Sequence, residues 1–224
     1  MIPFESLSLP LLRAKDGWTY QVTPRDLLVM ARSIRRESTR DGDAIPWMYA
    51  QRLYLLRRSY SSLAALATAY SQPINPAWFP SGRFCVPGGE YHGTRSCLDA
   101  PNRPGYAAAS WESLGDATQT ATARWARGDV PNPVPKVVHF AAESLVARQI
   151  AAGGTSEKRV IVRQGREPFT NTFLSTKTSR EWPDDFIQLE VGGKVVGTTS
   201  NPLPYVLGAL AIGAGVAVLV ARKR

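Results

Sequence analysis

One carboxylate, Glu37, lies where two predicted helices meet, and it could act as a general acid. The dipole of a helix favours cations and opposes a carboxylate at the C-terminal end. A partly packed glutamate at such an end should have its protonated form favoured, which is what a general acid requires. The alternative is a solvated glutamate paired with Arg36 or Arg40, because most charged residues near helix ends are solvated. Spacing alone leaves both interpretations open.

Two helices must position Glu37. Thr23 is a suitable N-cap for the first of them, and Pro24 suits its first helical position. An apolar stripe at helical spacing follows, consisting of Leu27, Ala31 and Ile34. Residues 38–42 then have loop composition, and Asp43 can cap a second helix. The stripe of this second helix consists of Ile45, Tyr49, Leu53 and Leu56.

Three segments resemble a known family in the same order along the chain. The run RRESTRDGD followed by AIPWMYAQRLYLLRR resembles the start of the cell-wall hydrolases that include spore-cortex-lytic enzymes. Residues 71–78, SQPINPAW, resemble the family's Gln-Pro-Gly-x-Phe-Ser segment. Residues 121–140 resemble its closing segment, which ends in His-Phe. The resemblance covers roughly residues 23–142, and Arg36 and Val134-Pro135-Lys136 depart from the family pattern.

The resemblance implies a mainly α, lysozyme-like domain that cleaves peptidoglycan between N-acetylmuramic acid and N-acetylglucosamine. Protonated Glu37 would donate to the leaving glycosidic oxygen. In a lytic transglycosylase the same carboxylate then takes a proton from the sugar's own hydroxyl, so no second acid is needed. The nearest candidates for a second acid, Asp41, Asp43 and Glu112, fit poorly. This favours transglycosylation over hydrolysis.

The remaining candidate site residues are assigned to substrate binding. Gln72 could orient the sugar amide, and Trp78 could stack on a sugar ring. His139 is carried over from the family's His-Phe pair, and Tyr49 of the second helix is included with it. An isolated histidine beside valines is more often a hydrogen-bonded structural residue, so that alternative stays open for His139.

The chain has two cysteines, Cys85 and Cys97, separated by eleven residues. In an envelope-facing protein they would form one disulfide, stabilising the fold by roughly 2–3 kcal/mol. In a reducing cytosol they would remain thiols. A zinc site would need two more ligands, and His92 is the single histidine between them. We therefore expect no metal and no cofactor.

Residues 204–221 are uncharged and are followed at once by Arg222-Lys223-Arg224. Seventeen or eighteen helical residues span about 26 Å, enough for a thin bilayer. The sequence thus predicts a C-terminal transmembrane helix with its basic end on the cytoplasmic side. Small residues at every fourth position favour oligomerisation through this helix. The alternative is a buried core helix.

Taken together, these patterns divide the chain into an arm (1–22), the lysozyme-like domain (23–152), a small β-hairpin module (155–201) and the transmembrane helix (204–221). Further helices are predicted at 63–70, 110–127 and 141–152. The net charge of +9 and a pI near 9.9 suit an anionic partner, which could be nucleic acid, a membrane surface or a bacterial envelope. Nothing at residues 1–23 looks like a secretory signal.

A membrane-anchored body without a secretory signal predicts delivery from outside the cell. We therefore expect a virion-associated enzyme that opens the cell wall during phage genome entry, with its catalytic domain on the periplasmic side. Its expected partners are peptidoglycan, a bilayer, other virion proteins and further copies of itself. The alternatives are a non-enzymatic virion protein on a lysozyme-like scaffold, and a DNA-ejection-channel protein that uses the positive charge.

Overall fold

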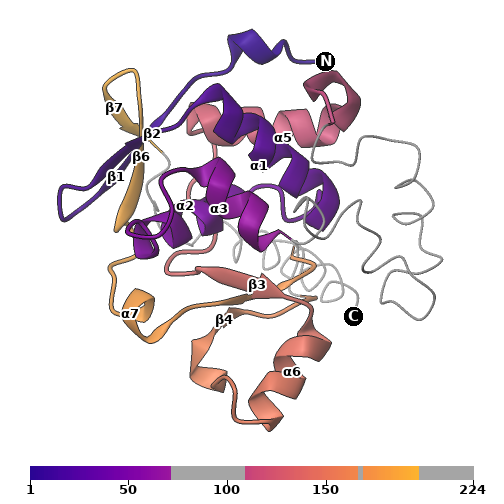
Figure 1. The fold of residues 1–224 in the computed structure, drawn as a ribbon, viewed down its shortest axis with the longest axis vertical. Helices are drawn as coiled ribbons and strands as arrows, with labels where there is room; N and C mark the ends of the chain where they lie inside the picture. Colours follow the sequence, from indigo (N-terminus) through magenta and orange to yellow (C-terminus); the bar gives the residue numbers. More distant parts are fainter. Residues whose placement is uncertain (72–108, 166–168, 197–224) are drawn as a thin grey trace, which may run out of the picture.

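Helices α1, α2, α3 and α5 form the centre of the molecule in the computed structural model (Figure 1). The structure describes residues 1–71, 109–165 and 169–196. The central helices are α1 (Pro24–Glu37), α2 (Ile45–Leu55), α3 (Leu63–Tyr70) and α5 (Asp116–Arg127). The shorter helical elements are η1 (Phe4–Ser6), η4 (Trp111–Leu114), α6 (Glu143–Ala151), η5 (Glu157–Arg159) and α7 (Lys177–Arg180).

Helix α1 begins and ends where the sequence predicts. The Thr23 hydroxyl accepts a hydrogen bond from the Asp26 amide at 3.2 Å, and the Asp26 carboxylate accepts one from the Thr23 amide at 2.9 Å. This reciprocal pair is a capping box, which satisfies two donors that would otherwise lack partners. The helix ends at Glu37 because Ser38 is extended. The predicted stripe is fully buried and consists of Leu27, Ala31 and Ile34.

The start of α2 and the helix expected at 110–127 follow the sequence less closely than α3 does. Asp43 does not cap α2, which begins after Ala44 without a side-chain cap. Asp43 instead pairs with Arg124 of α5 at 3.2 Å. Helix α3 occupies the predicted residues 63–70. The helix expected at 110–127 is interrupted at Gly115, where φ is +80°, so that η4 and α5 are separate elements.

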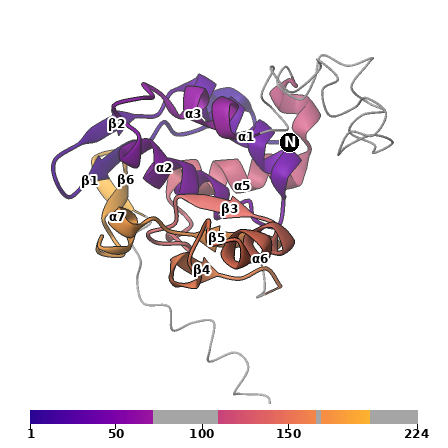
Figure 2. The same ribbon diagram turned by 60° about the horizontal axis from the view of Figure 1, so that its bottom comes forward.

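The strands form two antiparallel sheets, which lie beside different parts of the helical centre (Figures 1 and 2). Sheet A has the order β2-β1-β6-β7, and sheet B has the order β3-β5-β4. The strands of sheet A are β1 (Leu11–Ala14), β2 (Thr19–Gln21), β6 (Ile187–Val191) and β7 (Lys194–Val196). The strands of sheet B are β3 (His139–Ala141), β4 (Val160–Val162) and β5 (Thr172–Leu174).

Each sheet joins distant parts of the chain. Leu12 of β1 lies opposite Leu189 of β6, and both side chains are fully buried. In sheet B, β3 pairs with β5, so the residues predicted as a separate β module complete their sheets with strands from outside it. One hydrophobic core cluster unites helices and sheets through residues such as Trp47, Trp125 and Phe173.

The predicted mainly α fold class is wrong. Helix accounts for 44% and strand for 15% of the described residues, and the strands build two antiparallel sheets. The protein therefore has a mixed α and β architecture over these residues. The sequence predicts the hairpin of β6 and β7, but most of the other strands span three residues and their partners lie far away, as when Leu11 pairs with Glu190. Short runs carry too little periodicity to predict a strand.

The predicted membrane anchoring is also corrected. Within residues 1–71, 109–165 and 169–196, no helix combines the length and the apolar character that crossing a bilayer demands. Even α1 has 14 residues, whereas a span needs about 20. The predicted span at 204–221 lies outside the described residues.

Candidate functional site

Glu37 is the last residue of α1, and the end of α3 reaches its carboxyl group. The Ser71 hydroxyl donates a hydrogen bond to Glu37 Oε1 at 2.7 Å, and Ser71 is fully buried. Burial raises the pKa of the Glu37 carboxyl, and it outweighs the hydrogen bond from Ser71 and the charge of Arg36, which lower that pKa. The carboxyl therefore keeps its proton to a higher pH than an exposed glutamate would. This is the protonation that the sequence predicted for a general acid.

Tyr49 lies on α2 and forms part of the environment of Glu37. Its side chain is 1% exposed, so it contributes to the protein interior beside the carboxyl group and not to a surface that a substrate would touch. Burial raises the pKa of the Tyr49 hydroxyl, and the negative charge of Glu37 adds to that rise. The hydroxyls of Ser33 and Ser71 and the charge of Arg52 act in the opposite direction. Tyr49 is thus a neutral phenol at neutral pH.

Arg52, one helical turn after Tyr49, connects α2 to α3 and β3. Its guanidinium carbon lies 3.5 Å from the centroid of the Tyr70 ring, which is a cation–π contact. Its Nη1 lies 3.2 Å from His139 Nδ1. Because arginine can only donate, Nδ1 must be the acceptor, and the neutral imidazole carries its proton on Nε2.

His139, the first residue of β3, is held in its neutral form. Burial, together with the positive charges of Arg52 and Arg159, lowers the pKa of His139 to about 4. The histidine is therefore uncharged at neutral pH. Two of the predicted site residues, Glu37 and His139, are connected through α3 and α2. Ser71 donates to Glu37, the preceding Tyr70 stacks with Arg52, and Arg52 donates to His139.

The turn that follows Glu37 is fixed by a second carboxylate, Asp41, which is 1% exposed. Asp41 accepts hydrogen bonds from the Thr170 amide at 2.8 Å, the Thr170 hydroxyl at 2.8 Å and the Asn171 side chain at 2.6 Å. The Ser38 hydroxyl also bonds to the Thr170 hydroxyl at 2.7 Å. These contacts tie the end of α1 to the segment that enters β5.

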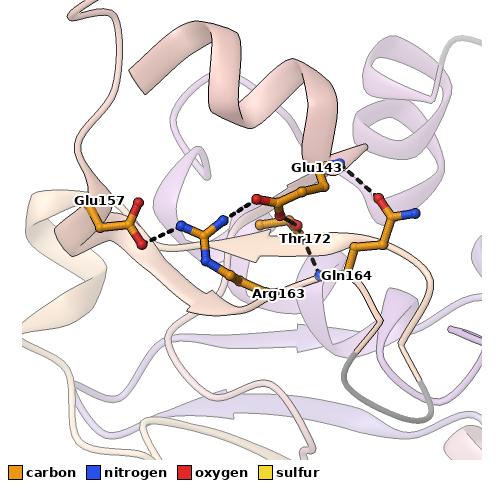
Figure 3. A network of polar contacts seen from close by, with 5 residues as sticks. All are labelled: Glu143, Glu157, Arg163, Gln164 and Thr172. Atoms are coloured by element: carbon orange, nitrogen blue, oxygen red, sulfur yellow. Dashed lines mark hydrogen bonds and ion pairs between the residues drawn. The ribbon is translucent and has the colours of Figure 1, made fainter. Parts of the chain in front are cut away.

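The same segment is held from its other side by the network in Figure 3. The Thr172 hydroxyl donates to Glu143 Oε2 and accepts from the Gln164 amide at 3.0 Å. Arg163 donates to Glu143 and to Glu157, bridging α6 and η5. Consecutive residues of one short segment, 170–172, therefore contact Asp41 on one side and this network on the other.

A buried glutamine on α2 fixes the turn that leads to His139. The Gln51 amide nitrogen donates to the carbonyls of Val134 at 3.0 Å and Val137 at 2.9 Å. Its carbonyl oxygen accepts from the Lys136 amide at 2.6 Å. Lys136 adopts a φ of +67°, which is unfavourable for a residue with a side chain, and the contacts with Gln51 compensate for that cost.

Four predicted site residues cannot be compared with this geometry. Gln72, Trp78, Cys85 and Cys97 lie outside the described residues. Their assignment to substrate binding and to a disulfide therefore stays a prediction. Within the described ranges, no three or more His, Cys, Asp or Glu side chains are grouped so that they could hold a metal ion.

Comparison of the chain with protein-family models, with curated proteins and with solved structures found no match. The resemblance to cell-wall hydrolases therefore rests on the quoted segments alone. Sequence reasoning did not identify Ser71 and Arg52 as members of this region, and it considered Asp41 only as a poor candidate for a second acid. Arg52 had a local signal, since it follows Tyr49 by three residues on a predicted helix and so shares its side of the helix. Ser71 and Asp41 had none, because the residues that they contact lie far away in the chain.

Proposed function

We propose that this protein cleaves glycan strands of peptidoglycan, with Glu37 as the general acid. The observation that carries the proposal is the environment of Glu37. It ends a helix, it is partly buried, and it receives one hydrogen bond from Ser71. Its pKa is raised as a proton donor requires. The order of the three resembling segments supports a glycan as the substrate.

In the proposed reaction, the proton on the Glu37 carboxyl moves to the glycosidic oxygen as the bond from that oxygen to the anomeric carbon breaks. The resulting carboxylate then takes the proton from a hydroxyl group of the sugar that contains this anomeric carbon. The oxygen of that hydroxyl group bonds to the anomeric carbon. The proton returns to Glu37, and the product carries an internal ring in place of an added water.

One carboxylate is sufficient for this sequence, and the nearby acids are engaged elsewhere. Asp41 accepts from Thr170 and Asn171, and Asp43 pairs with Arg124. Their engagement favours transglycosylation over hydrolysis. Delivery by a phage is not part of the proposed function, because that expectation depends on the membrane anchor.

The test is digestion of purified sacculi by the full chain and by the Glu37→Gln variant, followed by mass spectrometry of the released fragments. Glu181→Gln is the matched control, because Glu181 is exposed. We expect Glu37→Gln to release fragments at least 10²-fold more slowly, since general acid catalysis contributes about 10²- to 10⁴-fold. Glu181→Gln should match the wild type.

Each fragment should be lighter by one water than the hydrolysis product. Equal release by wild type and Glu37→Gln would overturn the role of Glu37. Failure of both to release fragments would overturn the activity itself. Release of fragments that contain the added water would leave Glu37 as the general acid but would show that the reaction is hydrolysis and not transglycosylation.

A further inference from the structure

Two partly buried arginines act on His139, and neither has a carboxylate partner within residues 1–71, 109–165 and 169–196. Arg52 comes from α2 and Arg159 from η5, and the positive charges of both lower the pKa of His139. The arginines that form ion pairs in these ranges include Arg13, Arg57, Arg124, Arg127 and Arg163. Partly buried cations without a counter-charge are costly, so their convergence calls for an anion.

Both guanidinium groups are held in place by neutral partners. Arg52 packs on the Tyr70 ring at 3.5 Å and donates to His139 at 3.2 Å. Arg159 donates from its Nε to the Ser175 carbonyl at 2.8 Å. A guanidinium has five N–H donors, and these contacts use one on each arginine. The remaining donors form the planar fork that recognises carboxylate groups.

We propose that Arg52, supported by Arg159, binds a carboxylate of the glycan substrate, namely one on the peptide stem attached to muramic acid. This inference rests on the proposed function and adds the substrate class to it: a glycan that carries peptide stems, in preference to an uncharged polymer of the same sugars. His139 takes part as a positioning residue, because its neutral Nδ1 accepts from Arg52 and adds no third charge.

The position of Arg52 favours a carboxylate on this substrate over the phosphate of a nucleic acid. Arg52 stacks on the ring of Tyr70, and the next residue along the chain, Ser71, donates to Glu37, so the anion site adjoins the proposed reaction site. A peptide stem branches from the sugar ring whose bond is broken. One substrate can therefore place its glycosidic oxygen near Glu37 and its carboxylate near Arg52.

The test measures binding to the full chain carrying Glu37→Gln, so that no ligand is consumed. The probes are muramyl dipeptide and the same molecule with its free carboxylate amidated. We expect the carboxylate form to bind about 10- to 100-fold more tightly, the size expected for charge-assisted hydrogen bonds. Adding Arg52→Gln should abolish this preference, and Arg159→Gln should reduce it. Arg148→Gln, at an exposed arginine, should leave it unchanged.

Equal binding of the two probes, or no binding of either, would overturn the proposal. The proposal would also be overturned if the Arg52→Gln variant still unfolds cooperatively and still prefers the carboxylate form of the probe. A single-stranded DNA oligonucleotide could bind more tightly than muramyl dipeptide and lose this binding in Arg52→Gln. That result would overturn the proposal and would identify the ligand of Arg52 as a phosphate. Arg159→Gln keeps the test valid if loss of the Tyr70 contact unfolds the Arg52 variant. Binding can succeed while sacculi remain uncleaved, so the two proposals fail separately.

Discussion

Two carboxylates four residues apart, Glu37 and Asp41, occupy opposite kinds of environment. Glu37 receives one hydrogen bond among those of the described residues, and its burial is not offset by further donors. Asp41 is more deeply buried and receives three side-chain and backbone donors from residues 170–171. The two carboxylates are distinguished by the number of hydrogen-bond donors that each receives, and not by how deeply each is buried. The carboxylate with few donors can carry and release a proton, whereas the carboxylate with many donors holds the fold.

The two roles depend on each other. Asp41 and Ser38 fix the turn after α1 to the start of β5, and this turn determines where the Glu37 side chain begins. The position of the Glu37 carboxyl therefore depends on contacts between residues that lie far apart in the sequence. A change at Asp41 should act on stability first, whereas a change at Glu37 should act on chemistry first.

The largest effect on stability is expected at Asp41. Replacing Asp41 with Ala removes the acceptor of three hydrogen bonds and leaves partly buried donors without this partner. We expect a loss of about 2–4 kcal/mol in the free energy of unfolding, measured by urea denaturation. Asp185→Ala is the control, because its ion pair with Lys15 is exposed and should be worth about 0–1 kcal/mol. Equal losses in the two variants would contradict the structural role of Asp41.

A second effect concerns His139, whose folded pKa of about 4 lies below that of an unfolded histidine. The unfolded chain therefore binds the proton more readily, so His139 favours the folded state at neutral pH. That contribution should be lost as pH falls from about 6.5 towards 4, at a cost on the order of 1–3 kcal/mol. Urea denaturation at several pH values measures it, and His139→Gln should flatten the dependence. An unchanged slope in this variant would contradict the assignment.

The smallest effect is expected from Glu37→Gln on stability, and its sign is informative. The folded pKa of Glu37 is raised, so its favourable contribution is present at low pH and is lost as pH rises. At pH 7 the variant, which is uncharged at this position, should be more stable than the wild type by about 0.5–2 kcal/mol. The difference in stability between the variant and the wild type should shrink as the pH falls below the pKa of an ordinary glutamate. A variant that is less stable at pH 7 would place Glu37 in the same class as Asp41.

What the sequence predicts well is local. The bounds of α1 follow from Thr23, Pro24 and an apolar stripe, all within one helix length. The hairpin at Gly192-Gly193 is equally local, since both glycines have positive φ and the flanking strands pair directly. Each of these signals acts between residues a few positions apart, which a single sequence shows plainly.

What the sequence does not predict depends on contacts between distant residues. Ser71 meets Glu37 across 34 residues, His139 meets Arg52 across 87, and Asp41 meets Thr170 across 129. No spacing rule connects such pairs. The pairing of strands also depends on distant residues, because β1 pairs with β6, which lies near the other end of the described chain. The mainly α prediction failed for this reason.

The most direct measurement is a ¹³C NMR titration of the Glu37 carboxyl in the full chain, assigned by its absence in Glu37→Gln. A short unstructured peptide with one glutamate, in the same buffer, supplies the reference. We predict that Glu37 titrates at a clearly higher pH than the glutamate of this peptide and that Ser71→Ala raises its pKa further, because the hydrogen bond from Ser71 favours the ionised form. Titration of Glu37 at or below the pH at which the peptide titrates would contradict the proposed general acid.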